Sequence, residues 1–250
     1  MLVAAAVCPC PPLLVPEVAA GAAPELDAAR AACAVALGVL AAARPDLLVV
    51  VGPADGTGSA SYPQGTAGSF RGFGVDLGVR LGASPDRTGD TADARPDSEA
   101  GRDLPPALAV GAWLLGRAGW THAPVEGLGV PEPLAAERCI QEGRDLAARA
   151  ERVALLVMGD ASACRTLKAP GYLDERAAPF DAEVARALEA ADTAALRALD
   201  PVLAGELQVS GRAPWQVLAG AAENSPFTGA LLYEDAPYGV GYLVATWSRP

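Results

Sequence analysis

The sequence predicts an α/β protein of three layers, in which helices cover both faces of a central, mostly parallel sheet. Strand-like and helix-like segments alternate along the 250 residues, as in chains built from βαβ units. The runs at 47–51 and 153–158 are apolar throughout, which is typical of strands buried on both faces. A chain of this length can bury a large core, and we expect residues 1–250 to form one domain.

In the first half of the chain, strands are expected at residues 2–7, 47–51 and 72–77, and a helix at 24–44. Pro24 suits the first turn of that helix. Four of its apolar side chains repeat on one face, as a helix packed on a sheet requires: Leu26, Cys33, Leu37 and Leu40. Residues 54–70 are rich in Gly, Ser and Thr and are expected to form a loop.

The segment 83–103 contains six acidic residues and almost no apolar side chain larger than alanine. Such a composition cannot offset the entropy lost on ordering, so we predict a mobile loop.

In the second half, the expected elements are a helix at 104–117, a strand at 121–128, a helix at 133–149, a strand at 153–158, two or three helices within 180–207, a short helix at 214–218, and strands at 229–233 and 240–247. Asp192 and Thr193 are the candidate caps of one helix, and Asp200-Pro201 is expected to interrupt the helical run.

Composition excludes several classes of function. The formal net charge of −11, with no cluster of arginines, disfavours nucleic acid as a partner. No run of 18 apolar residues is present, so no membrane span is expected, and residues 2–7 lack the basic start of a signal peptide. Five widely spaced cysteines do not resemble a disulfide framework and favour a cytoplasmic location. With one histidine, His122, the chain has no conventional multi-histidine metal site.

Three apolar strands end in unusual loops. The first strand is followed by Cys8-Pro9-Cys10-Pro11-Pro12, the second by Gly52-Pro53-Ala54-Asp55-Gly56, and the strand at 153–158 by Gly159-Asp160-Ala161-Ser162-Ala163-Cys164. Ligands of open α/β sheets bind beyond the carboxyl ends of the strands. If the strands are parallel, these loops meet at one crevice, and Cys10, Ala54 and Asp160 lie close together.

These loops resemble those of the LigB-type class III extradiol dioxygenases, whose wider superfamily includes the MEMO-like proteins. That family places Pro-His-Pro after the first strand, where this chain has Pro9-Cys10-Pro11. It places a histidine after the second strand, where this chain has Ala54. It often carries Gly-Asp-x-Ser-His after a later strand, and residues 159–163 match this except at Ala163. The resemblance runs through the whole chain and implies a LigB-like α/β/α fold.

The resemblance implies a chemistry that this sequence does not keep. The family holds a non-haem Fe(II) with two histidines and a carboxylate, and uses another histidine as the acid/base. Cys10, Ala54 and Ala163 replace these histidines, and the carboxylate corresponds to either Glu223 or Glu234. We therefore expect no iron cofactor and no ring cleavage, and a small aromatic or anionic ligand at the strand ends.

Seven residues are candidates for the site. Cys10 occupies a ligand position of the family, and Asp160 is a carboxylate just after a buried strand that must be hydrogen-bonded or used, so these two are the candidate catalytic residues. The candidate ligand-binding residues are Asp55, Ser162, Cys164, Arg165 and Tyr172. Basic and aromatic groups past Asp160 suit an anionic or phenolic ligand. Structural interpretations stay open: a buried cysteine at Cys10, a backbone acceptor at Asp160, and a hydrogen-bonded His122.

Two alternative functions also stay open. In the first, the chain is an enzyme whose Cys10, Asp55, Asp160 or Cys164 works with a different metal, such as zinc or iron at a remodelled site, or with none. In the second, the chain is an interaction subunit, for example in a homo-oligomer, with the old crevice as the interface.

Overall fold

The central sheet of the protein has seven strands, in the order β3-β6-β2-β7-β1-β9-β8. The computed structural model describes residues 1–82, 102–223 and 225–249. Four neighbouring strands are parallel: β6 (Val125–Val130), β2 (Leu47–Pro53), β7 (Val153–Met158) and β1 (Leu2–Cys8). Antiparallel strands close both sides: β3 (Ala60–Tyr62) beside β6, and β9 (Tyr242–Ser248) then β8 (Thr228–Asp235) beside β1. The sheet is therefore central and mostly parallel, as predicted.

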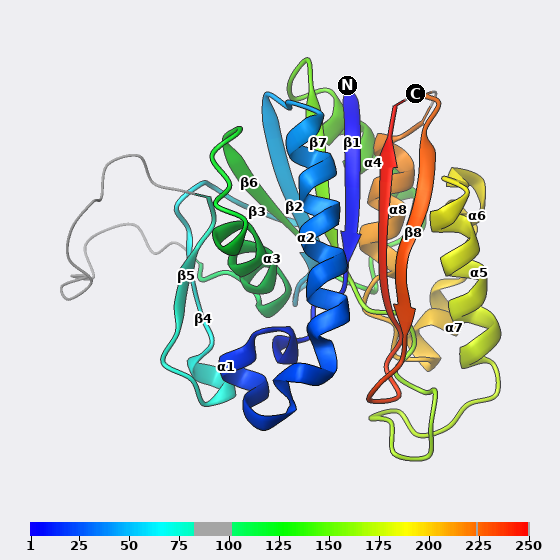
Figure 1. Cartoon of the computed structure of the whole chain (residues 1–250). Coiled ribbons are helices and arrows are strands. Elements are labelled where there is room, and N and C mark those ends of the chain that lie inside the picture. The colour runs from blue at the N-terminus through cyan, green and yellow to red at the C-terminus, as the bar shows by residue number, and fades with distance from the viewer. Residues whose placement is uncertain (83–101, 224, 250) are drawn as a thin grey trace.

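Helices cover both faces of this sheet (Figure 1). The helices α2 (Asp27–Ala42) and α3 (Pro106–Arg117) lie on one face, and α4 (Ala136–Ala147), α5 (Ala177–Glu189) and α8 (Arg212–Ala221) on the other. Alternate side chains of each strand enter opposite cores. In β7, for example, Val153, Leu155 and Val157 face one core, and Ala154, Leu156 and Met158 the other. This is the predicted three-layer α/β/α arrangement.

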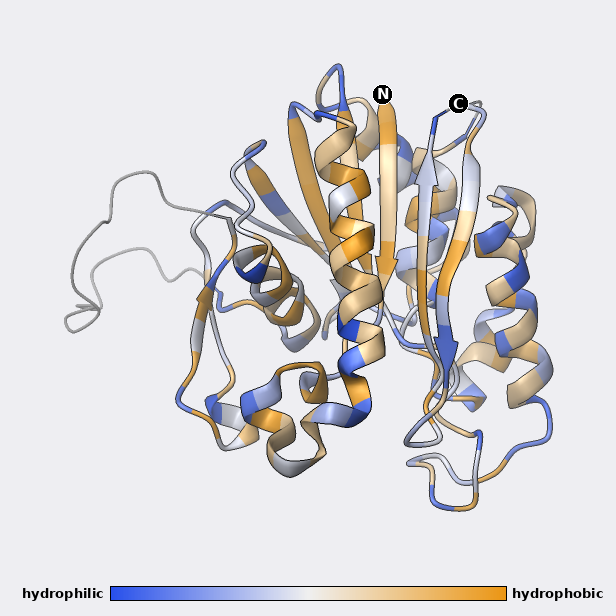
Figure 2. Cartoon of the chain, viewed as in Figure 1, coloured by the Kyte–Doolittle hydropathy of each residue, from blue (hydrophilic) through white to orange (hydrophobic). Residues whose placement is uncertain are grey.

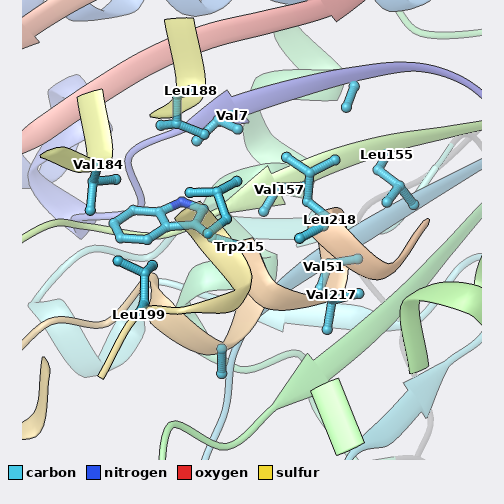
Figure 3. Packing of buried hydrophobic residues seen from close by; sticks show 14 of the residues in the cluster. Val7, Val51, Leu155, Val157, Val184, Leu188, Leu199, Trp215, Val217 and Leu218 are labelled. Carbon is cyan, nitrogen blue, oxygen red and sulfur yellow. The ribbon is translucent and has the colours of Figure 1, made fainter. Parts of the chain in front are cut away.

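Hydrophobic residues concentrate where the two cores need them. Figure 2 shows mostly hydrophobic colour on the central strands β1 and β2, and every residue of β1 and β7 is buried. On the α8 side, Trp215 packs between Val7 and Val157 of the sheet and Val184 and Leu188 of α5 (Figure 3). The continuous apolar runs of the sequence thus mark strands covered on both faces, as expected for a parallel sheet.

Most predicted elements are present, with changed ends. The strand at 153–158 is β7, and the run at 47–51 is the core of the central strand β2. The predicted helix 24–44 begins only at Asp27, because Ala20–Leu26, which includes Pro24, forms a 3-10 helix. Smaller elements before it are a 3-10 helix at Pro12–Leu14 and α1 (Pro16–Ala19).

The predicted cap at Asp192 and the predicted interruption at Asp200-Pro201 are confirmed. The Asp192 side chain accepts a hydrogen bond from the Ala195 N–H at 3.0 Å, at the start of α6 (Thr193–Arg197). Asp200 accepts from the Val202 N–H at 2.8 Å and begins α7 (Pro201–Glu206). Caps of this kind can be predicted from the local sequence, because the side chain bonds to a backbone N–H only two or three residues away.

Two predictions about residues 54–77 are wrong. The expected loop at 54–70 contains two short strands, β3 and β4 (Ala67–Ser69). The expected strand at 72–77 is absent: Arg71–Phe73 is a 3-10 helix, and the strand is β5 (Gly78–Arg80), which pairs with β4. These three-residue strands are too short to show an apolar alternation, and their pairing partners decide where they form.

The predicted mobile segment 83–103 falls, except for Arg102 and Asp103, outside the described residues. Within the described part of the chain, no helix combines the length and the apolar character needed to cross a membrane.

Helices α4 and α8 pack at a distance that only glycine allows. A Cβ atom at Gly143 would lie 2.0 Å from the carbonyl oxygen of Val217, and one at Gly220 would lie 2.1 Å from that of Ile140. We expect Gly143→Ala to lower the free energy of unfolding by about 1–3 kcal/mol, because the two backbones must separate. Urea denaturation measures this.

Gly38→Ala is the matched control. Gly38 is also helical, but a Cβ there meets no atom within 4 Å, so alanine should stabilise the helix by about 0.5–1 kcal/mol. Equal unfolding midpoints for the two variants would contradict the close packing of α4 and α8.

Candidate functional site

A cleft of about 600 Å³ opens at the carboxyl ends of the four parallel strands. Each strand contributes a residue to its lining: Cys10 after β1, Ala54 and Asp55 after β2, Glu132 after β6, and Asp160 after β7. The predicted convergence of Cys10, Ala54 and Asp160 is therefore confirmed. Parallel strands cause this convergence, because their carboxyl ends all lie at the same edge of the sheet.

Seven prolines line the cleft. Pro105 and Pro106 come from the start of α3, where proline fits the first turn without the loss of a hydrogen bond. Pro11 and Pro131 follow β1 and β6. Proline has a fixed φ angle and no N–H group, so this wall is stiff and apolar.

Asp160 links three of the loops. Its Oδ1 atom accepts a hydrogen bond from the Cys10 N–H at 2.8 Å, and its carbonyl oxygen accepts one from the Ser210 N–H at 3.2 Å. A Cβ atom at Gly159 would lie 2.5 Å from the Cα atom of Gly211, so this approach of the loop to α8 requires glycine. Burial raises the pKa of the Asp160 carboxyl to about 7, although the Cys10 N–H and thiol favour its charged form.

Cys10 is a neutral thiol in this setting. Its side chain is only 7% exposed, and burial raises its pKa well above the usual value, with the Asp160 carboxyl adding to the effect. The thiolate is the nucleophilic and metal-binding form of cysteine, so a protonated Cys10 is poorly suited to either role.

Glu132 is a site residue that the sequence analysis missed. Its carboxylate lies at the start of α8, where both oxygens are 3.4 Å from the Ala213 nitrogen, whose N–H donates to them. Its Oε2 atom forms an ion pair at 3.6 Å with Nε of Arg212, which is too far for a hydrogen bond. The Arg212 side chain is fully buried, and its Nη1 atom donates to the Leu134 carbonyl at 2.8 Å. Burial raises the pKa of Glu132 to about 7, and Arg212 opposes this only in part.

Tyr242, at the start of β9, is the second residue missed. It is 2% exposed and lines the cleft, and its hydroxyl has no hydrogen-bond partner in the described part of the chain. Burial raises its pKa, and the nearby Asp160 and Cys10 raise it further. The phenol thus stays protonated and can donate or accept a hydrogen bond.

Of the five predicted ligand-binding residues, only Asp55 lines the cleft. Ser162 is fully buried, and both its N–H and its hydroxyl donate to Asp181 of α5 at 2.9 Å. The buried Cys164 thiol faces the carbonyl of Leu207 at 3.5 Å. Tyr172 is 62% exposed and does not line the cleft.

Arg165, the fifth, lies in a second cavity of about 740 Å³, together with Lys168, Leu167 and Tyr238. Its Nη1 atom is paired with the Asp181 carboxylate at 2.9 Å. Backbone bonds join residues 161–165 to 239–241 between the two cavities: Ala161 N–H to Gly241 O, Gly241 N–H to Ser162 O, and Arg165 N–H to Gly239 O. The single crevice expected from the sequence is therefore two cavities with a shared wall.

The cleft does not fit the iron site that the family resemblance implies. Ala54 has no donor atom, and Ala163 is buried outside the cleft. Glu223 is paired with Arg144 and Arg197, and neither it nor Glu234 lines the cleft. In the described ranges, no group of three or more His, Cys, Asp and Glu side chains is placed to hold a metal ion.

His122 lies away from the cleft. It is exposed, precedes β6 at the opposite end of that strand, and its ring contacts the Trp120 ring edge-on at a centroid distance of 5.2 Å. A group at the amino end of β6 cannot act on a ligand at the carboxyl ends, so His122 is no acid/base for this cleft.

The fold and the cleft together define an α/β protein with a ligand-sized cavity at the carboxyl ends of its parallel strands. No family model and no curated protein matches the chain. A solved structure similar to it is that of an uncharacterized protein, JW3007, from Escherichia coli K12. The two chains are 16% identical, with a TM-score of 0.49, over 98% of this chain and 99% of the other. This likeness names neither a family nor an activity.

Proposed function

We propose that the chain is a LigB-like protein that binds a small ring-bearing molecule in the strand-end cleft and does not cleave it. The observation that carries this proposal is the convergence of a carboxyl, a phenol and a thiol, from Asp160, Tyr242 and Cys10, in one proline-lined cleft. Its volume of about 600 Å³ is within the usual range for small-molecule sites. Stiff apolar walls with a few polar groups suit a flat ring that carries polar substituents.

The proposed lack of ring cleavage follows from the donor atoms. Ring cleavage in the resembled family needs iron fixed beside the substrate, and Ala54 offers no ligand for it. A positioned base contributes about 10²–10⁴-fold to such reactions, and Ala163 can neither accept nor donate a proton. An anionic ligand is the less favoured alternative, because the Asp160 and Glu132 carboxyls both face the cleft.

The test measures binding and turnover of the same catechols. Untagged protein is reconstituted with Fe(II) without oxygen, and then mixed with a catechol panel in air. We expect saturable binding by calorimetry, but no yellow ring-opened product above the level of free Fe(II). Turnover above that level, lost in Cys10→Ala or Asp160→Asn, would show that a working metal site is present and that the proposal is wrong.

A matched pair of variants locates the binding. Val240 lines the cleft, so Val240→Trp should block it and abolish the binding heat. Val202 is 67% exposed on α7 and does not line the cleft, so Val202→Trp should bind as the unmodified protein does. Urea denaturation of both variants checks that each is folded. Binding that survives Val240→Trp in a folded protein would place the ligand elsewhere.

A further inference from the structure

We infer that the ligand of the cleft is an organic cation, a ring that carries an amidinium or ammonium group. This inference rests on the proposed function and adds the charge of the ligand to it. The group that recognises the cation is Asp160, assisted by Glu132 and the hydroxyl of Tyr242.

The first support is the charge of the lining. Three carboxyl side chains line the cleft, from Asp55, Glu132 and Asp160, and the described lining contains no Lys or Arg. Arg212 is fully buried, lies 3.6 Å from Glu132 and donates hydrogen bonds to Leu134 and Gln216, and it does not line the cleft. A cation that enters the cleft therefore meets three carboxyls. Arg212 already faces Glu132, so the main attraction comes from Asp160, which faces no cation in the described part of the chain.

Basic side chains are present nearby, but the fold keeps them out of the cleft. Arg165 and Lys168 line the second cavity. The paired segments 161–165 and 239–241 stand between them and the cleft. An anionic ligand would thus find its counter-charges in the second cavity, and the cleft is left to a cation.

The second support is the unmet hydrogen-bonding capacity of Asp160. In the described part of the chain, its carboxyl receives only the N–H and the thiol of Cys10, and neither group is charged. Glu132 is little better served, with the Ala213 nitrogen at 3.4 Å and Arg212 Nε at 3.6 Å. A carboxylate in such a site gains most from a charged N–H donor, since charge-assisted hydrogen bonds are about twice as strong as neutral ones.

The third support is independent of the acidic groups. Tyr242 is 2% exposed and lines the cleft, and its hydroxyl has no partner among the described residues. The hydroxyl is not one of the fully enclosed polar atoms without a partner in the described part of the chain, so it opens to the cleft and can bond a ligand there. Its lone pairs can accept an N–H of the same cationic group, and its ring can contact the cation face-on.

Three near-isosteric probes test the inference: benzamidinium, benzamide and benzoate, which are cationic, neutral and anionic. At pH 8, we expect calorimetry to show that benzamidinium binds at least about tenfold more tightly than benzamide. A difference of this size corresponds to one charge-assisted contact. Benzoate should bind most weakly of the three in the cleft. Asp160→Asn should remove most of the advantage of benzamidinium and change the affinity for benzamide by less than about twofold.

Glu137→Gln is the control for the general attraction of a cation to an acidic protein. Glu137 is exposed at the start of α4 and does not line the cleft. This variant loses the same formal charge as Asp160→Asn, but outside the cleft. It should therefore leave the affinity for benzamidinium unchanged. An equal loss in both variants would mean that only the net charge matters, and the inference would be wrong.

The outcomes separate this inference from the proposed function. If benzamide and benzamidinium bind equally and Val240→Trp abolishes both, the cleft binds rings without regard to charge; the proposed function stands and the inference fails. If benzoate binds most tightly and Val240→Trp abolishes that binding, the inference fails in the same way. If none of the three binds, the inference fails, and binding of the catechol panel decides the proposed function. If binding survives Val240→Trp in a folded protein, both fail.

Discussion

Asp181→Ala should lower the free energy of unfolding by about 2–5 kcal/mol, because it leaves several buried polar groups without a partner. Asp181 is 1% exposed. Its carboxylate accepts hydrogen bonds from the Ser162 N–H, the Ser162 hydroxyl and Nη1 of Arg165, each at 2.9 Å. Ser162 cannot reach water because it is fully buried, whereas the Arg165 side chain is 28% exposed, so most of the expected loss comes from the N–H and hydroxyl of Ser162.

The matched control for this prediction is Glu183→Ala, two residues further along the same helix. Glu183 is paired with Arg186 at 2.6 Å, but both side chains are about half exposed. An exposed pair of this kind is worth about 0–1 kcal/mol. Urea denaturation at pH 7 compares the two variants, and losses of equal size would contradict the structural role of Asp181.

The cleft could be predicted from the sequence because buried parallel strands have a recognisable sequence pattern. The fully apolar runs of β2 and β7 identify strands covered on both faces, and such strands are parallel as a rule. Parallel strands place their following loops at one edge, so Cys10, Ala54 and Asp160 had to meet. The order of apolar and loop segments along the chain is therefore enough to place these residues together, without knowledge of any long-range contact.

The residues that line the cleft cannot be distinguished by sequence from those that form its supporting wall. Ser162 and Arg165 follow β7 closely, and from the sequence they are as good candidates for ligand binding as Asp160. Their partner Asp181 lies 19 residues beyond Ser162, on α5. These polar groups face Asp181 only because that helix packs on the loop. No local sequence pattern predicts this packing.

The two missed residues differ in how well they could have been found. Glu132 had a signal: it follows β6 as Asp160 follows β7, but the predicted strand ended at 128 and β6 continues to Val130. Tyr242 had no such signal. It reaches the cleft from the amino end of β9, and that end lies beside the carboxyl ends of the parallel strands because β9 is antiparallel to β1. The direction of a strand is a tertiary property that its residues do not encode.

The stability of the protein should fall as the pH rises from 5 to 8, because Asp160 and Glu132 are partly buried without adequate counter-charge. Each carboxyl has a folded-state pKa of about 7, raised by burial from ordinary values of 3.8 and 4.5. The folded protein therefore holds two protons between pH 5 and 7 that the unfolded chain has released. By linkage, the free energy of unfolding is then highest at low pH and decreases as the pH rises through 7.

The neighbouring groups do not obscure this trend. Cys10 and Tyr242 stay protonated to well above pH 8, because burial raises the pKa of each. One unit of pKa shift corresponds to about 1.4 kcal/mol. With allowance for partial exposure of both carboxyls, the decrease between pH 5 and 8 should be on the order of 2–5 kcal/mol, and urea denaturation at several pH values measures it.

Asp160→Asn should remove about half of this pH dependence and should make the protein more stable than the unmodified chain at pH 8. The asparagine oxygen can still accept the Cys10 N–H, so the loop connection is kept while the buried charge is lost.

Asp174→Asn is the control. The hydrogen bonds from Arg176 lower the pKa of Asp174 to about 2, so this carboxyl is charged in both the folded and the unfolded state from pH 5 to 8. The control should shift the stability curve without a change of slope. Parallel curves for the unmodified protein and Asp160→Asn would show that the Asp160 carboxyl is charged throughout this range, and that the cleft is better solvated than its geometry indicates.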